Sequence, residues 1–178
     1  MKARTSILLN VVLFQIGWWA CVLSAANNYA VQAALALAAI VAIQILIHVS
    51  PVRALLLALV CLSLGAAIES IFAAAHVTAY QSADLMLGLA PVWMAGLWAL
   101  LSTTLDVSLR WLRGRWLLGI TLGAAAGAMS YAGGARLGAL SLPRGYSLWV
   151  IAAVWGLALP LLIQLACTRE FGPREDAR

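Results

Sequence analysis

Residues 55–77 read LLLALVCLSLGAAIESIFAAAHV, and Glu69 is the one residue among them with a formal charge at neutral pH. An apolar α-helix of about 20 residues crosses the roughly 30 Å hydrocarbon core of a bilayer, because each residue adds about 1.5 Å. The run therefore predicts a transmembrane helix. A charged side chain inside the hydrocarbon costs about 2.5–3.5 kcal/mol, so we expect Glu69 to face the interior of a helix bundle and to have a polar partner there.

The composition of the whole chain also predicts a membrane protein. Of its 178 residues, 65% are hydrophobic and 10% are charged, whereas soluble domains have roughly 45–50% apolar and about 25% charged residues. Six apolar windows fit the sequence with short joints between them: Ile7 to Ala25, Ala30 to Val49, Leu55 to Val77, Met86 to Leu105, Trp116 to Leu137 and Tyr146 to Cys167. We predict an all-α fold: a polytopic transmembrane bundle of six helices over residues 1–168, then a short cytoplasmic tail, 169–178.

The distribution of basic residues predicts the orientation of the bundle. With both termini in the cytoplasm, nine of the eleven Lys and Arg residues lie on the cytoplasmic side, and Arg136 and Arg144 lie outside. This asymmetry follows the positive-inside rule. It accounts for the net charge of +5, so we expect no nucleic-acid partner.

The first window has an alternative interpretation as a secretory signal peptide. The stretch MKARTSILLNVVLFQIGWWACVLSAA has a basic start, an apolar centre and small residues at its end. Its apolar part is longer than a typical signal-peptide core, and cleavage would remove the first of six well-spaced helices. A retained first helix is therefore the favoured interpretation, and the intact mass distinguishes the two.

Polar residues from two predicted helices are expected to meet near the outer surface. Glu69 and His76 share one face of the third helix, two turns apart. The fifth helix carries Tyr131 and then Arg136 as it approaches the same surface, and a guanidinium matches a carboxylate in two-pronged geometry. We expect these four side chains to line one ligand-binding site. The alternative is a structural tie between helices, with the arginine extended toward the lipid headgroups.

Three tryptophans are candidates for the wall of an apolar cavity beside that site. Trp18, Trp93 and Trp98 fall well inside the predicted spans, away from the interfaces where tryptophan is usually found in membrane proteins. The alternative is that each ring is bulk that faces lipid or the protein core.

Glycines recur at every fourth position of the fifth predicted helix, at Gly119, Gly123 and Gly127. Small residues at this spacing let helix backbones approach closely in lipid. We therefore expect tight packing along this stripe, and we place the fifth helix at the centre of the bundle.

The sequence lacks the motifs of common enzymes and metal sites. It contains no HExxH, GxSxG or P-loop pattern, and its three cysteines fall on separate helices without metal-type spacing. We predict no catalytic residue, no metal and no cofactor. At the cytoplasmic end, Asp106 and Arg110 are four residues apart and are expected to pair along a helix face. With the neighbouring arginines they form either a site for a lipid phosphate or a topological anchor.

A resemblance to a known family is carried by three blocks: LLNVVLFQIGWWACVLSAA, LAPVWMAGLWALLSTTLDVSLRWL and GAAAGAMSYAGGARLGAL. Over most of the chain, the sequence resembles an uncharacterised family of small proteobacterial inner-membrane proteins, a domain of unknown function. Tyr131 and Arg136 fall on the SY and GAR elements, and that family often has asparagine at the position of Asp106. The resemblance implies a multi-pass protein of a bacterial inner membrane, with gene neighbours that modify membrane fatty acids.

The sequence supports two functional hypotheses. The first is a binding module, or a transport component, for a membrane lipid or small amphipathic molecule, with its polar site in the outer leaflet or mid-membrane. The alternative is an accessory or scaffold subunit that binds a protein partner in the inner membrane, in a lipid-modifying assembly. An intramembrane enzyme with Glu69 or His76 as its base has no supporting motif.

Overall fold

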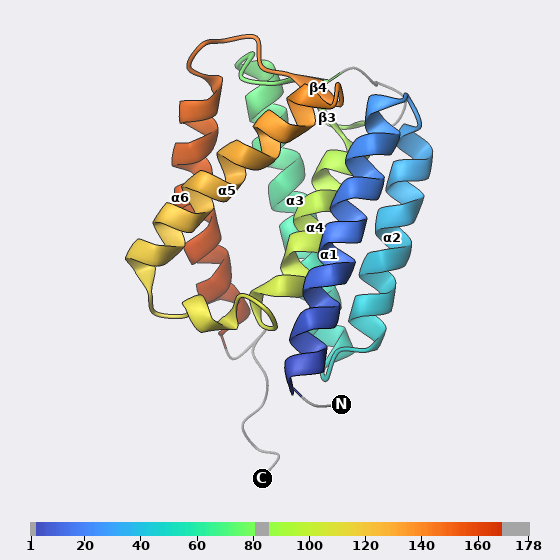
Figure 1. Ribbon diagram of the computed structural model, residues 1–178, viewed down its shortest axis with the longest axis vertical. Coiled ribbons are helices and arrows are strands. Elements are labelled where there is room, and N and C mark those ends of the chain that lie inside the picture. Colours follow the sequence, from blue (N-terminus) through green and yellow to red (C-terminus); the bar gives the residue numbers. More distant parts are fainter. Residues whose placement is uncertain (1–2, 81–85, 169–178) are drawn as a thin grey trace.

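The computed structural model describes residues 3–80 and 86–168, and in these ranges the chain forms six α-helices (Figure 1). The helices are α1 (Ala3–Ala26), α2 (Ala30–Leu46), α3 (Pro51–Ala74), α4 (Val92–Leu105), α5 (Trp116–Arg136) and α6 (Ser147–Ala166). The predicted all-α bundle of six helices is confirmed. Four helical segments are long and apolar enough to cross a membrane: Ile7–Ala26, Pro51–Ala74, Trp116–Arg136 and Ser147–Ala166.

The two remaining helices are shorter than the sequence windows predicted. α2 has 17 residues and α4 has 14. The window that was expected to start at Met86 begins instead with a tight turn, because β2 (Met86–Leu87) pairs antiparallel with β3 (Ala90–Pro91) around Gly88, which has a φ of 71°. Pro91 then stands at the N-cap of α4 in an extended conformation. Proline restricts the residue before it to extended conformations, so helix α4 begins only after it.

Helix α4 lies at the centre of the bundle (Figure 1). α4 contacts α1, α2, α3 and α6, and ten of its residues are buried. Large apolar side chains cover the outside of the bundle, including Leu46, Leu117, Met129 and Trp149, each more than 70% exposed. Such an outer surface suits acyl chains rather than water.

The predicted central position of α5 is wrong, although its predicted glycine packing is confirmed. α5 crosses the edge of the bundle and packs mainly on α6 (Figure 1). A Cβ atom built on Gly123 would lie 2.4 Å from the carbonyl oxygen of Trp155, and one on Gly127 would lie 2.4 Å from Trp155 Cγ. The absence of side chains at these positions is what lets the two backbones approach.

We call the end of the bundle where α1 begins and α6 ends the basal end, and the opposite end, uppermost in Figure 1, the apical end. α3 terminates at the apical end in a Schellman motif: the Val77 amide donates to Phe72 O at 2.8 Å and the His76 amide to Ala73 O at 3.0 Å. His76 takes the left-handed position with a φ of 52°, where glycine or asparagine is usual. The chain therefore reverses direction sharply after the helix.

This reversal positions the next segment over the end of α3. Val77 and Thr78 are buried, and β1 (Ala79–Tyr80) pairs antiparallel with β4 (Leu140–Ser141), Tyr80 opposite Leu140. The pairing ties the segment after α3 to the segment after α5. It brings the Tyr80 side chain close to the last turns of α3.

Candidate functional site

Glu69 is completely buried near the apical end and accepts hydrogen bonds from three side chains. Tyr80 Oη donates to Oε2 at 2.7 Å, Trp98 Nε1 donates to Oε1 at 2.9 Å, and Tyr131 Oη also donates to Oε1. These donors come from the segment after α3, from α4 and from α5. We call these four residues the Glu69 cluster; it joins α3 to three other parts of the fold through one carboxyl group.

The predicted pairing of Glu69 with Arg136 is not formed, because Glu69 is bonded instead to two tyrosines and a tryptophan. Arg136 is exposed. It stands five residues after Tyr131, which turns its side chain about 140° away around the helix axis. His76 is also exposed, and it occupies the left-handed position that ends α3. The structure thus brings Glu69 and Tyr131 together and leaves the other two residues outside the cluster.

The three predicted wall tryptophans lie close to the Glu69 cluster. Trp98 is bonded to Glu69, and Trp93 packs edge-on against Tyr80 with ring centroids 6.0 Å apart. Trp18 donates to Ser130 Oγ at 2.9 Å. The hollow that Trp18, Trp93 and Tyr131 line measures about 10 Å³, which is the size of a single water site at most. Ligand binding by these residues stays a prediction.

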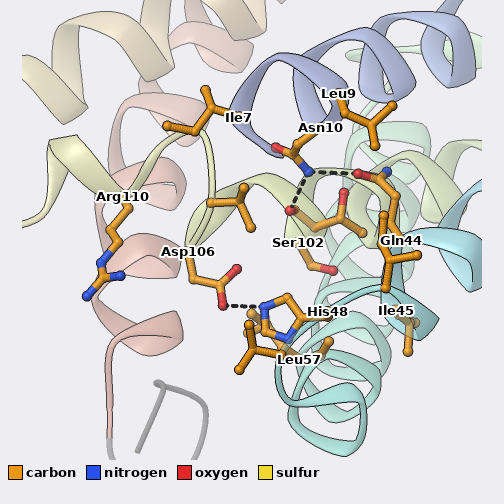
Figure 2. A pocket seen from close by; sticks show the side chains of 15 residues that line it. Ile7, Leu9, Asn10, Gln44, Ile45, His48, Leu57, Ser102, Asp106 and Arg110 are labelled. Carbon is orange, nitrogen blue, oxygen red and sulfur yellow. Dashed lines mark hydrogen bonds and ion pairs between the residues drawn. The ribbon is translucent and has the colours of Figure 1, made fainter. Parts of the chain in front are cut away.

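A much larger pocket, of about 460 Å³, lies at the opposite, basal end of the bundle (Figure 2). It is formed where the start of α1 and α3 meets the end of α2 and α4. Its apolar lining is Ile7, Leu9, Ile45, Ile47, Val49, Ala54, Leu57 and Val107, and its polar lining is Asn10, Gln44, His48, Ser102, Thr103, Asp106 and Arg110. We call this the basal pocket. Its volume falls within the usual range for small-molecule sites, about 300–1,000 Å³.

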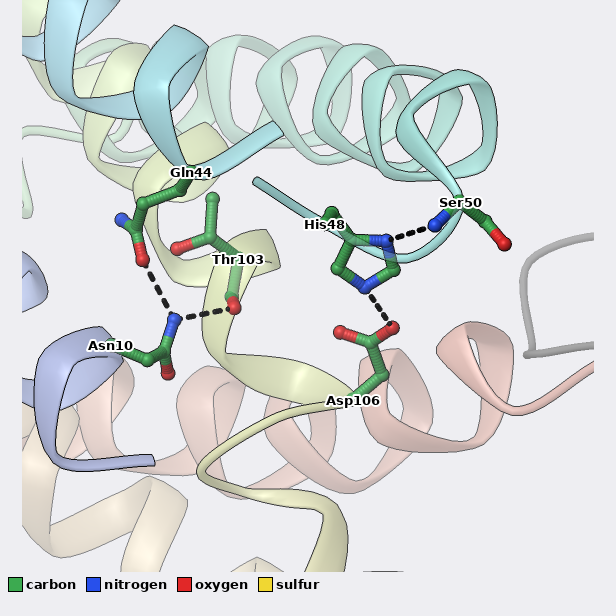
Figure 3. Close-up of polar contacts among 6 residues, drawn as sticks. All are labelled: Asn10, Gln44, His48, Ser50, Thr103 and Asp106. Carbon is green, nitrogen blue, oxygen red and sulfur yellow. Dashed lines mark hydrogen bonds and ion pairs between the residues drawn. The ribbon is translucent and has the colours of Figure 1, made fainter. Parts of the chain in front are cut away.

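Two buried carboxamides form part of the pocket lining (Figure 3). Asn10 Nδ2 donates to Gln44 Oε1 at 2.7 Å and to Thr103 O at 2.8 Å. Thr103 lies in the last turn of α4, whose carbonyls have no partner within the helix. Asn10 therefore caps the C-terminal end of α4 from α1.

The Thr103 carbonyl also fixes which way both amides point. A carbonyl only accepts, so the atom of Asn10 that faces it must be the nitrogen. That nitrogen then requires the oxygen of Gln44 opposite it. As a result Asn10 Oδ1 and Gln44 Nε2 are buried without a hydrogen-bond partner in the described part of the chain. A buried polar atom left unpaired costs about 1–3 kcal/mol.

A hydrogen bond joins His48 and Asp106 at the mouth of the pocket, and it is an ion pair when the ring is protonated (Figure 3). His48 Nε2 lies 2.8 Å from Asp106 Oδ2, and the Ser50 amide donates to His48 Nδ1 at 3.0 Å. Because Nδ1 accepts, the neutral ring carries its proton on Nε2 and donates it to Asp106. Both ring nitrogens are occupied, so His48 has no free lone pair with which to act as a general base.

The predicted pair of Asp106 and Arg110 is replaced by this ion pair. α4 ends at Leu105 and Asp106 is its C-cap, whereas Arg110 begins a separate 3₁₀ turn, η1 (Arg110–Leu112). The four-residue spacing brings side chains together only within one continuous helix. Arg110 instead stands exposed at the rim of the pocket, where Figure 2 shows its side chain directed away from Asp106.

The ion pair predicts a pH dependence of stability. The hydrogen bond to Asp106 raises the pKa of His48 above its usual value, although burial opposes this. A pKa raised by folding adds stability that is complete below the unfolded value, about 6.5, and is lost as the pH rises through the folded value. We expect the thermal midpoint of the purified protein to fall as the pH rises above about 6.5, and this fall to shrink in His48→Gln.

The matched control is His76→Gln, which replaces an exposed histidine at the apical end. This variant is expected to keep the pH profile of the original protein. An unchanged profile in His48→Gln would show that the ion pair does not contribute to the pH dependence.

Sequence reasoning missed the basal pocket. It singled out no role for Asn10 or Gln44, and it placed His48 only by its depth. A signal was present: Asn10 and Gln44 are polar residues inside predicted spans, at a depth similar to that of the run Ser102-Thr103-Thr104. Polar residues at one depth in several spans indicate a shared interior site.

Comparison with known families places the chain in a family of unknown function. The family described as "Protein of unknown function (DUF2878)" matches residues 7–161. The chain belongs to this family. The expectation of an uncharacterised family is therefore confirmed, and the residues of both the Glu69 cluster and the basal pocket lie within the DUF2878 region. No curated protein and no solved structure matches the chain.

Proposed function

We propose that this protein is a membrane-embedded binding module for a small amphipathic molecule and that the basal pocket is its site. The observation that carries the proposal is the pocket of about 460 Å³, whose lining combines apolar side chains with polar ones. Ligand sites combine mostly apolar walls with a few placed polar groups, and the basal pocket has this composition.

We also propose that the basal pocket lies on the cytoplasmic side of the membrane. The basal end carries Arg110, Arg113 and Arg115 between α4 and α5, and short loops rich in arginine stay on the cytoplasmic side. In a bacterial inner membrane the basal pocket then faces the cytoplasm. A ligand enters from that side or from the inner leaflet, and the module serves transport if the pocket also opens to the other side.

The Glu69 cluster supports a second candidate, a scaffold subunit with a protein partner in the membrane. Its carboxyl group is fully buried and has three donors. Such a saturated arrangement holds helices together and leaves little room for a ligand. This observation favours a structural role for the apical end and is compatible with a binding site at the basal end.

The proposal is tested by filling the basal pocket with a large side chain. Ala54 lines it from the first turn of α3, whereas Ala67 is exposed on the same helix. In native mass spectrometry of the purified protein with octanoate, octylamine and 1-octanoylglycerol, we expect one-to-one adducts of at least one compound. Ala54→Trp should lose these adducts at least tenfold, and Ala67→Trp should keep them.

Two outcomes of this experiment would contradict the proposal. If all three compounds bind Ala54→Trp as they bind the original protein, the amphipaths do not occupy the basal pocket. If none binds either the original protein or Ala67→Trp, the scaffold candidate replaces the binding module.

A further inference from the structure

We propose that residues 110–116, the segment between α4 and α5, bind the phosphate group of an anionic phospholipid in the membrane leaflet at the basal end. We call these residues the arginine turn. They include Arg110, Arg113 and Arg115, and Figure 1 shows the segment at the basal end of the bundle. This lipid site lies on the outer surface of the protein and shares only Arg110 with the basal pocket, so it does not depend on the proposed function.

The arginine turn has a defined backbone that leaves its charged side chains outside. Leu112 is 3% exposed and anchors η1 in the buried core. The Arg113 amide donates to Arg110 O at 3.1 Å, and the Arg115 amide donates to Leu112 O at 2.9 Å. Gly114 closes the turn with a φ of 74°, which glycine adopts at no steric cost. All three arginines are exposed and are therefore accessible to a headgroup.

The three arginines form no salt bridge with residues 3–80 or 86–168. Those ranges contain two side-chain carboxylates: Glu69 is buried near the apical end, and Asp106 is bonded to His48. Three positive charges thus stand within six consecutive residues without a counter-charge in the described part of the chain. A guanidinium binds a phosphate through two parallel hydrogen bonds, and clusters of basic residues beside a membrane span attract anionic lipids.

Two tryptophans place the arginine turn at the level of the lipid headgroups. Trp111 and Trp116 are 52% and 46% exposed, and tryptophan in membrane proteins is enriched at the membrane–water interface. The apolar span of α5 begins at Trp116, so the arginines stand just outside the hydrocarbon, where lipid phosphates lie. Arg115 Cζ is 5.8 Å from the centroid of the Trp111 ring, a cation–π contact that holds this guanidinium at the same level.

The excess of positive charge selects an anionic phospholipid over a zwitterionic one. Phosphatidylglycerol and phosphatidylcholine have the same phosphodiester, but the choline ammonium would lie among the guanidinium groups and be repelled. Each basic residue near an anionic membrane surface strengthens the attraction by about fivefold. Two of the arginines are therefore expected to produce a preference of about tenfold or more.

The test is native mass spectrometry of the full-length protein in detergent micelles, titrated with phosphatidylglycerol or with phosphatidylcholine of the same acyl chains. We expect phosphatidylglycerol to bind about tenfold more tightly, and Arg113→Gln/Arg115→Gln to reduce this preference to about twofold or less. The matched control, Arg136→Gln/Arg144→Gln, removes two exposed arginines at the apical end and should keep the preference. Both variants retain Arg110 at the rim of the basal pocket.

Two further variants identify the cause of the loss. Arg113→Lys/Arg115→Lys keeps both charges and should keep the preference within about threefold. Ala54→Trp fills the basal pocket and should leave the preference unchanged. Because each value is a ratio of two lipids on one protein, a partial loss of folded protein does not change it.

Four outcomes would overturn the inferred lipid site. Equal binding of the two lipids by the original protein would leave the arginines as a topological anchor only. The same preference in both glutamine variants would place the lipid elsewhere, and its loss in the lysine variant would mean that charge does not set it. If glycerol phosphate binds as tightly as phosphatidylglycerol, the surface recognises a soluble phosphate and not a lipid.

The basal pocket is tested separately by its own ligands. If phosphatidylglycerol is preferred but octanoate, octylamine and 1-octanoylglycerol form no adducts, the proposed function fails and the lipid site stands. If those adducts form and are lost in Ala54→Trp while the two lipids bind equally, the proposed function stands and the lipid site is wrong. Loss of the lipid preference in Ala54→Trp would place the phospholipid in the basal pocket and overturn its assignment to the arginine turn.

Discussion

Replacement of Glu69 by alanine is expected to lower the free energy of unfolding by about 3 kcal/mol or more. The change leaves Tyr80 Oη, Trp98 Nε1 and Tyr131 Oη without their acceptor. Each buried donor without a partner costs about 1–3 kcal/mol, and the lost side-chain volume adds a cavity. The measurement is reversible unfolding of the purified protein in mixed micelles, followed by circular dichroism.

Two further variants show whether the loss comes from the hydrogen bonds. Glu69→Gln keeps the shape and one acceptor oxygen, and its amide nitrogen can donate to Tyr80 Oη, so we expect a loss of only about 1 kcal/mol. Ser63→Ala removes an exposed hydroxyl on the same helix and should change stability by less than about 0.5 kcal/mol. If Glu69→Ala unfolds like the original protein, the carboxyl group does not hold the apical end together.

The burial of Glu69 was predictable because it depends on one property of the sequence, the charge of a residue inside an apolar helix. Its meeting with Tyr131 was also predictable, since both residues approach the same end of their helices. The other two donors were not. Tyr80 reaches the carboxyl group only because His76 ends α3 in the left-handed conformation and β1 pairs with β4, and these are consequences of the turn rather than of hydrophobic periodicity.

The predicted arginine partner is wrong because complementary charge does not set the direction in which a side chain leaves its helix. Arg136 follows Tyr131 by five residues, which places it on a different face of α5. Neutral donors satisfy the carboxyl group without burying a second ion. Desolvation of a buried ion pair is costly, so neutral donors avoid the free-energy cost of burying a guanidinium.

The central position of α4 could not be read from the sequence for a different reason. α4 is the shortest of the six described helices, and its window resembles the other apolar windows in composition. Its position depends on which helix surfaces fit together, which single-helix patterns do not report. The basal pocket follows from this arrangement, because Asn10 from α1 caps the carbonyl of Thr103 where α4 ends.

The second large effect is expected from Gly127→Ala, which should lower the free energy of unfolding by about 1–3 kcal/mol through overpacking. The added methyl group would lie 2.4 Å from Cγ and 2.5 Å from Cβ of Trp155. These atoms are close to the backbone of α6 and cannot move without moving the helix. Trp155 is stacked on Trp98 with ring centroids 4.5 Å apart, so the displacement also reaches the donor that holds Glu69.

Gly133→Ala on the same helix is the matched control, because its added Cβ lies 3.6 Å from Trp18, an ordinary contact. Alanine stabilises a helix relative to glycine by about 0.5–1 kcal/mol where space allows, so this variant should be at least as stable as the original protein. The difference between the two variants then isolates the close approach of α5 to α6. Equal stability of the two would mean that α5 is not seated against Trp155, and Trp98 would then have to be held against Glu69 without support from α6.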